Sequence, residues 1–342
     1  MSEPLRPHDP RRVDVRRTRG PSPEVIARRR LVVGGGTVLG LGVLGLGVRE
    51  LVAGDAAASP AAATIVASSR STAAAGSGPP TASPTASPSV AAGSPSVAAG
   101  VAPTVVEAPR LAGRLEDYLS GRSGRLGLEL VDLRRGQAFR HEATEGFCYS
   151  TIKVLVLTTV LRQAQEAKVD LTRKQRALAE RMITRSDNAA TETLLAQVGR
   201  DEVRRVAGLV GMDRTEIDEG WWGHWRTVPG DLNAMVLALL SGDDVLDGAR
   251  RTVARFLMAD VVAEQRWGVF APESRGVHVA AKNGWGPLPD GYRLNSTGWV
   301  IADDREYVLS ILSRSTAGFS HGRRTVNEVA DICHAAMADG LS

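Results

Sequence analysis

Hydrophobic positions follow two different periods along residues 109–342. Where they recur every three to four residues they predict helices, over 110–121, 147–161, 173–185, 188–198, 201–210, 229–240, 248–261 and 323–337. Where apolar and polar residues alternate or β-branched residues cluster they predict strands, over 125–133, 138–143, 277–282, 294–302 and 306–313. Strands at both ends with helices between them indicate an α+β fold. We expect one antiparallel sheet flanked by helices, with an inserted all-α subdomain.

The N-terminal part of the chain has a different composition. Residues 1–30 hold nine arginines against four acidic residues, whereas the whole chain has a net charge of only +4. The basic character therefore belongs to this tail, which we interpret as cytoplasmic, and no nucleic-acid partner is indicated. Residues 49–108 are almost entirely Ala, Ser, Pro, Thr, Gly and Val, which predicts a disordered linker or stalk.

An uncharged apolar run, residues 31–48, directly follows three arginines. As a helix it would span about 27 Å, just enough to cross a bilayer. The arginines predict a cytoplasmic N-terminus, so the rest of the chain would lie outside the cytoplasm. Two interpretations remain open: a retained single-pass signal anchor in the cell membrane, or a signal peptide that is cleaved to release a secreted protein.

Several kinds of chemistry have no support in the sequence. HExxH, CxxC and His-rich clusters are absent, so neither a metal nor another cofactor is expected. A GxSxG nucleophile elbow is absent as well. Cys148 and Cys333 permit one disulfide, although two buried thiols are an equal alternative. The sequence carries no signal for an oligomer, and we expect a monomer.

The predicted helix 147–161 is apolar nearly all round but contains Ser150 and Lys153. Three residues apart on a helix, their side chains share one face, so the hydroxyl and the amine can meet. Burial lowers a lysine pKa, which would let Lys153 act as the base that activates a Ser150 nucleophile. The alternative is a helix-capping serine beside a lysine whose stem lies along the apolar surface.

Two further segments carry candidate site residues. In Ser186-Asp187-Asn188, Ser186 could relay a proton and Asn188 could bind a substrate amide; the alternative is an ordinary N-cap. The second segment follows a predicted strand, where Lys282 would meet a substrate carboxylate. There Gly284 would leave room for substrate, and the Trp285 N–H would join the Ser150 N–H in an oxyanion hole. The alternative is a strand that ends in an Asn-Gly turn.

In this order, Ser-x-x-Lys, Ser-Asp-Asn and Lys-x-Gly resemble the three motifs of the class A β-lactamases and penicillin-binding D-Ala-D-Ala peptidases. The resemblance covers about residues 110–340 and implies the β-lactamase/transpeptidase-like fold. It further implies an acyl-enzyme serine hydrolase that acts on β-lactams, on peptidoglycan stem peptides, or on both. A non-catalytic module that binds a wall peptide or a partner in the same cleft is the alternative function.

The chain departs from the family pattern at two places. Asn283 stands where the family has a threonine that helps to hold the substrate carboxylate, so we expect an amide to contact substrate there. The family's Ω-loop glutamate, which activates water for deacylation, has no clear counterpart in the shorter segment 215–232. Glu216 and Glu219 are the available carboxylates, and we expect Glu219 to be the base. Trp221, Trp222 and Trp225 either line the cleft or fill space beneath the shortened loop.

Overall fold

A computed structural model describes residues 102–142, 145–242 and 244–341. The predicted tail, the apolar segment 31–48 and the linker up to residue 101 lie outside these residues. Within the described ranges, no helix is both long enough and apolar enough to cross a bilayer.

Six strands form the main sheet in the order β1-β3-β2-β8-β7-β6. Their bounds are β1 Thr104–Val105, β2 Gly124–Asp132, β3 Gln137–His141, β6 His278–Leu288, β7 Gly291–Ile301 and β8 Glu306–Ser315. All neighbours are antiparallel except β1 and β3, which are parallel. The short β1 takes the free edge of β3, where the Thr104 and Val106 amides donate to the carbonyls of Gly136 and Ala138 at 2.8 Å. Residues before 109 therefore belong to the sheet, where a disordered linker was expected, and one parallel pair interrupts the sheet that was expected to be antiparallel throughout.

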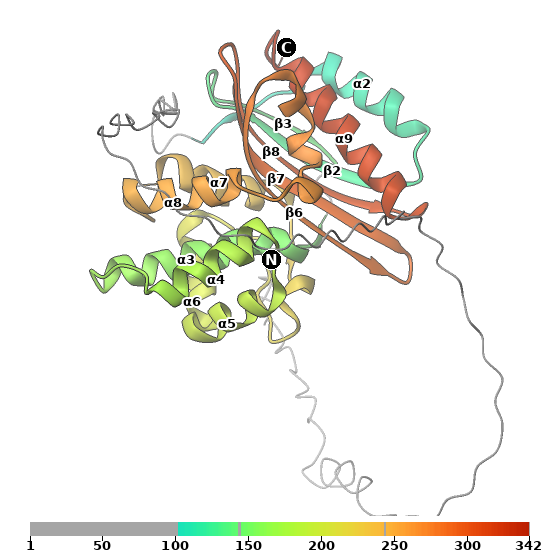
Figure 1. Ribbon diagram of the computed structural model, residues 1–342. Helices are drawn as coiled ribbons and strands as arrows, with labels where there is room; N and C mark the ends of the chain where they lie inside the picture. The colour runs from blue at the N-terminus through green and yellow to red at the C-terminus, as the bar shows by residue number, and fades with distance from the viewer. Residues whose placement is uncertain (1–101, 143–144, 243, 342) are drawn as a thin grey trace, which may run out of the picture. The chain divides into compact units, whose positions relative to one another are not determined.

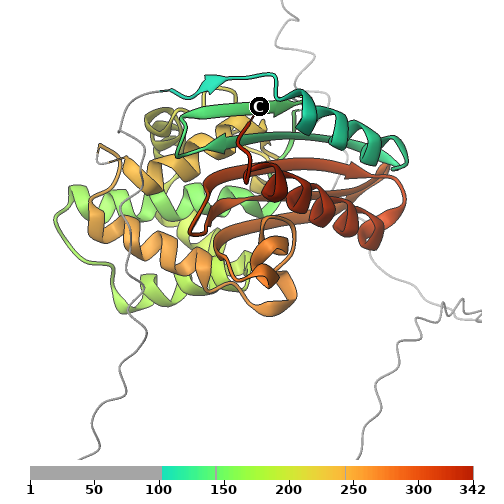
Figure 2. The ribbon, with the colours of Figure 1, turned by 90° about the horizontal axis from the view of Figure 1, so that it is seen from above.

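Two helices cover one face of the sheet: α2 (Pro109–Ser120) and α9 (Gly318–Ala336). The helical subdomain covers the opposite face, as the view from above shows (Figure 1, Figure 2). Its helices are α3 Lys153–Glu166, α4 Arg173–Thr184, α5 Asn188–Val198, α6 Arg200–Val210, α7 Pro229–Ser241 and α8 Gly248–Ala259. All of these helices were predicted, with bounds that differ from the prediction by a few residues at most. The exceptions are α9, which begins at Gly318 and not at residue 323, and the helix predicted over 147–161, whose α-helical part begins only at Lys153 and continues to Glu166.

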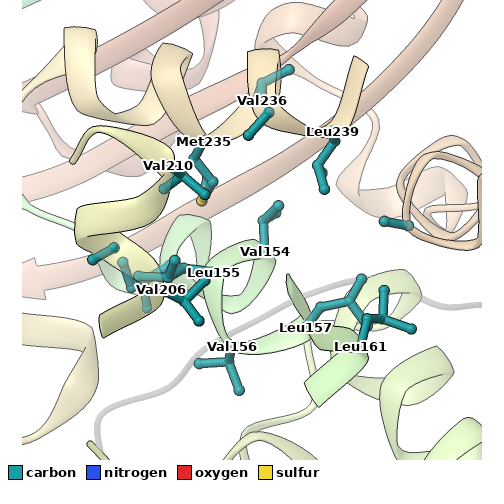
Figure 3. Packing of buried hydrophobic residues seen from close by; sticks show 14 of the residues in the cluster. Val154, Leu155, Val156, Leu157, Leu161, Val206, Val210, Met235, Val236 and Leu239 are labelled. Carbon is teal, nitrogen blue, oxygen red and sulfur yellow. The ribbon is translucent and has the colours of Figure 1, made fainter. Parts of the chain in front are cut away.

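Each face of the sheet has its own hydrophobic core. The larger core joins α3, α6 and α7 to the sheet, and α3 is buried on every side over Lys153–Leu161 (Figure 3). Val154, Leu155 and Leu157 of α3 belong to this core, as do Val206 of α6 and Met235 of α7. This buried stretch of α3 is a rigid support for the residues at its N-terminal end.

Two departures from the prediction lie beside the candidate site. Strand β6 continues through Asn283 and Gly284 to Leu288 instead of ending in a turn. A second, two-stranded sheet joins β4 (Gly146–Phe147) to β5 (Arg226–Thr227), and it was not predicted because each strand has only two residues. This small sheet connects the loop that carries Trp221, Trp222 and Trp225, the tryptophan-rich loop, to the segment that leads into Ser150.

Candidate active site

Ser150 lies in a 3₁₀ turn, η1 (Tyr149–Ile152), that runs directly into α3. The residue before it, Tyr149, has a left-handed backbone with φ of 46°. Such a conformation is costly for a bulky residue and is typically held only where the surrounding structure enforces it. Ser150 is half-buried, and among the described residues its hydroxyl has no hydrogen-bond partner. The nucleophile candidate is thus exposed to an incoming group.

Lys153, on the first turn of α3, is completely buried. Its Nζ donates to the Ser186 carbonyl at 2.6 Å, to Ser186 Oγ at 3.2 Å and to Asn188 Oδ1 at 2.8 Å. These acceptors lie at the start of α5, so the chain reversal between α4 and α5 supplies every hydrogen-bond acceptor that the amine has among the described residues. Ser186 itself has a left-handed backbone with φ of 56°.

Lys282 approaches the same hydroxyl from β6. Its Nζ donates to Ser186 Oγ at 3.1 Å and to the Asn283 carbonyl at 2.9 Å, and the side chain is fully buried. One serine hydroxyl therefore lies between two buried amines. Of the four lysines in the chain, these two are buried, whereas Lys168 and Lys174 are exposed.

Burial sets the protonation of both amines. Loss of solvent lowers the pKa of Lys153 to about 7, although Asp187 and Glu192 act in the opposite direction. Burial also lowers the pKa of Lys282 well below the ordinary lysine range, and the nearby charge of Lys153 adds to this effect. An amine with a pKa near neutrality is suited to accept a proton from a serine hydroxyl.

Strand β6 is an edge strand, and it lies against the Ser150 turn. A Cβ atom on Gly284 would lie 2.7 Å from Ser150 N and 2.9 Å from Cys148 O, so only glycine fits. The Asn283 carbonyl accepts from Lys282 and thus faces the free edge. Because alternate residues of a strand direct their amides to the same side, the Trp285 N–H also belongs to the free edge, beside the Ser150 turn.

The Asn283 side chain lies on the face of β6 opposite to Lys282, because consecutive residues of a strand point to opposite faces. It is fully buried, and its Nδ2 donates to the carbonyls of Gln265 at 2.7 Å and Trp267 at 2.9 Å. An amide held in this way anchors the loop before β6. The expected contact between the Asn283 side chain and substrate has no support in this geometry.

Asn295 of β7 was missed by the sequence analysis. It is buried, and its Nδ2 donates to the carbonyls of Phe147 at 2.6 Å and Cys148 at 3.3 Å, while its Oδ1 accepts from the Ser313 amide at 3.3 Å. Asn295 thereby fixes the segment just before Ser150. A lone asparagine within a predicted strand gives no sequence signal for such a role.

The tryptophan-rich loop lies over Lys153. Cys148 N donates to Trp225 O at 2.8 Å, and the buried Trp225 indole donates to Asp218 O at 3.1 Å. These bonds place the buried Trp222 ring with its centroid 4.9 Å from Lys153 Nζ, a cation–π contact. Trp221 is 41% exposed and meets the Tyr149 ring edge-on at 6.1 Å. Trp222 and Trp225 thus fill space beneath the loop, whereas Trp221 borders the site.

The prediction that Glu219 is the deacylation base is wrong. Its side chain is 79% exposed and forms ion pairs with Arg204 at 2.7 Å and Arg200 at 3.5 Å on the outer surface of α6. Glu216 is also exposed and faces Arg226 at 4.0 Å. Both carboxylates pair with arginines on the outer side, and the Trp222 indole lies beside Lys153.

Both cysteines are free and buried. Cys148 belongs to the larger core and Cys333 to the smaller one, on opposite faces of the sheet. The two thiols are therefore structural, which resolves the choice that the sequence left open.

Residues 174–337 match the family described as "Beta-lactamase enzyme family". The matched range includes Ser186, Asn188 and Lys282 and begins after Ser150 and Lys153. Among curated proteins, the "Putative lipoprotein LppW" of Mycobacterium tuberculosis (strain ATCC 25618 / H37Rv) is 25% identical over 234 residues, which cover 65% of this chain and 73% of that protein.

Solved structures share the fold. PBP-A superposes with a TM-score of 0.61 at 19% identity, covering 70% of this chain and all of that one. A representative class A β-lactamase from Bacteroides cellulosilyticus DSM 14838 gives 0.61 at 12% identity, over 68% of this chain and 99% of that one. The class A β-lactamase from Mycobacterium abscessus superposes with a TM-score of 0.56 at 19% identity, over 66% of this chain and 98% of that one. Over residues 174–337 the chain is similar to this enzyme family, and its fold is that of the class A β-lactamases and the similar PBP-A.

Proposed function

We propose that this protein is an extracytoplasmic serine hydrolase in which Ser150 forms an acyl-enzyme that persists. One observation carries the proposal: a buried lysine with a pKa of about 7, one helical turn from an unpartnered serine hydroxyl, shares the Ser186 hydroxyl with a second buried lysine. Burying two amines costs stability that a purely structural site would not require.

The residues define a sequence of proton and bond changes. Neutral Lys153 takes the proton from Ser150 Oγ as that oxygen attacks the substrate carbonyl carbon. The Ser150 and Trp285 amides donate to the resulting oxyanion. Ser186, between the two lysines, passes a proton to the leaving nitrogen as the C–N bond breaks. An ester on Ser150 remains, while Asn188 and Lys282 position the substrate amide and carboxylate.

Release of this ester requires an activated water, and the structure supports only slow release. The space next to Lys153 Nζ is occupied by the buried Trp222 ring, and both candidate glutamates lie on the outer surface of the loop. Without a placed carboxylate, the site lacks the base that the Ω-loop glutamate supplies for water in the similar family. Penicillin binding is therefore favoured over rapid β-lactam hydrolysis.

The relatives agree with this substrate class. The structure of a PBP-A mutant is an acyl-enzyme complex with penicillin G. It superposes on this chain with a TM-score of 0.60 at 18% identity, over 69% of this chain. By analogy, the substrates here are β-lactams and wall peptides with a similar amide bond. The relative named as a lipoprotein and the apolar segment 31–48 both support membrane attachment with the hydrolase domain outside the cytoplasm.

Fluorescent penicillin tests the proposal. The full chain should be labelled covalently, and peptide mapping should place the label on Ser150. Ser150→Ala should abolish labelling, whereas Ser123→Ala, an exposed serine outside the site, should retain it. Labelling that survives in Ser150→Ala would refute the nucleophile assignment.

A non-catalytic binding module remains the second candidate, favoured by the missing deacylation carboxylate. It predicts reversible binding of a wall peptide with no covalent adduct at any pH. Absence of labelling in the folded wild-type chain would support it.

A further inference from the structure

Three arginines stand in one row across adjacent strands at the end of the sheet. Arg125 of β2 is directly opposite Arg314 of β8, and Arg314 is directly opposite Arg293 of β7. Residues directly opposite one another lie on the same face, and neighbouring strands are about 4.8 Å apart. Like charges in such positions destabilise a sheet. We name these three residues the arginine row.

The row has too few counterions. Within the described ranges, Asp290 is the one carboxylate that forms ion pairs with the row, with Arg293 at 3.1 Å and Arg314 at 2.9 Å. Among the described residues Arg125 has no ion-pair partner. Arg293 Nη1 and Arg314 Nε are buried, and neither has a hydrogen-bond acceptor among the residues that the structure describes. Unpaired buried guanidinium N–H groups are costly, so a ligand that accepts from them would gain binding free energy.

A pocket of about 420 Å³ opens on the row. The three arginines line it together with Phe147, Asn295 and Glu145. The Glu145 carboxylate is already paired with Arg226 outside the row, which lowers its pKa. The pocket therefore keeps an excess of positive charge.

The row shares a sheet face with the active site. Arg293 is opposite Gly286, and Gly286, Gly284 and Lys282 are alternate residues of β6. The row thus lies beyond Lys282, toward the end of the sheet, separated from it by Gly284 and Gly286, against which the Ser150 turn and the Tyr149 ring pack. Asn295 links the two regions, since it lines the pocket and also holds Phe147 and Cys148.

We propose that the arginine row is a binding site for a ligand with at least two oxyanionic groups, carboxylate or phosphate. Three guanidinium groups at strand spacing match several negative groups on one molecule better than a single carboxylate. This site goes beyond the acylation of Ser150, because binding to the row needs no covalent step.

Titration calorimetry on the full chain with citrate and with pyrophosphate tests the site. Binding of citrate alone would indicate a carboxylate ligand, and binding of pyrophosphate alone a phosphate ligand. Binding should weaken as salt is raised, because screening reduces charge attraction. Failure of both anions to bind at low salt would overturn the proposal.

Arg125→Gln is the decisive variant, since Arg125 has no carboxylate partner to lose. We expect it to weaken anion binding by about tenfold or more while the melting temperature stays equal or rises, because a like-charge neighbour is removed. Arg173→Gln, an exposed arginine on α4, is the matched control and should bind as wild type. Unchanged binding in Arg125→Gln would refute the site. Binding retained in Ser150→Ala separates this result from the proposed acylation.

Discussion

At the scale of single residues, lysine is the informative amino acid of this chain. Four lysines stand against 38 arginines, and both buried lysines donate to the Ser186 hydroxyl. An arginine stays protonated at any physiological pH, whereas a buried lysine can lose its proton. Lys153 and Lys282 are therefore the cations of this site that can change protonation.

The pKa of Lys153 predicts the pH dependence of acylation. Only the neutral amine accepts the Ser150 proton, so acylation should rise with pH through about 7 and be about tenfold faster at pH 8 than at pH 6. Stopped-flow measurement of penicillin acylation would give the profile. Lys153→Arg should abolish the reaction, and Lys174→Arg, at an exposed position, should leave the profile unchanged. A rate independent of pH over this range would exclude Lys153 as the base.

Trp222 should control how long the acyl-enzyme lasts. Its ring covers Lys153, and its Nε1 has no hydrogen-bond partner within the described residues. Trp222→Leu should admit water and shorten the adduct lifetime, measured by intact mass over time. Trp222→Phe retains a ring and loses no hydrogen bond, so its adduct should persist. Equal lifetimes in the two folded variants would contradict this role.

At the scale of elements, the site depends on the close approach of β6 to the Ser150 turn. Gly284→Ala would place a Cβ against the Ser150 amide, where neighbouring backbone cannot move freely. We expect a loss of about 1–3 kcal/mol in the free energy of unfolding together with strongly reduced acylation.

Gly113→Ala provides the opposite control. Gly113 lies within α2, and an added Cβ would meet nothing within 4 Å. This change should stabilise the fold by about 0.5–1 kcal/mol and leave acylation unchanged. Denaturant unfolding measures the change in the free energy of unfolding for both variants, which should be a loss for Gly284→Ala and a gain for Gly113→Ala. An unchanged free energy of unfolding in Gly284→Ala would contradict the close packing of β6 against the Ser150 turn.

Most elements were predictable because their hydrophobic periods are long and regular. Helix α5 has the bounds expected from the pattern, and the order of strands and helices indicated the α+β fold. What failed depended on tertiary contacts. The side-chain directions of Asn283 and Glu219 follow from the loops packed around them, and the two-residue strands β1, β4 and β5 carry no periodic signal.

At the scale of the whole molecule, two cores on opposite faces of one sheet enclose one thiol each. Burial raises the pKa of both thiols, so neither should react while the protein is folded. A thiol reagent should modify Cys148 and Cys333 only at denaturant concentrations that unfold the domain, as followed by circular dichroism. Rapid modification of either thiol in the native protein would show that the corresponding core opens locally.

The central claim is a persistent acyl-enzyme on Ser150, and intact mass spectrometry of the full chain mixed with penicillin tests it most directly. We predict a mass increase of one penicillin that remains long after free penicillin is removed and that is absent in Ser150→Ala. Rapid turnover of a chromogenic cephalosporin without a lasting adduct would contradict the account, since it would require a deacylation base that the Trp222 side of the site does not provide.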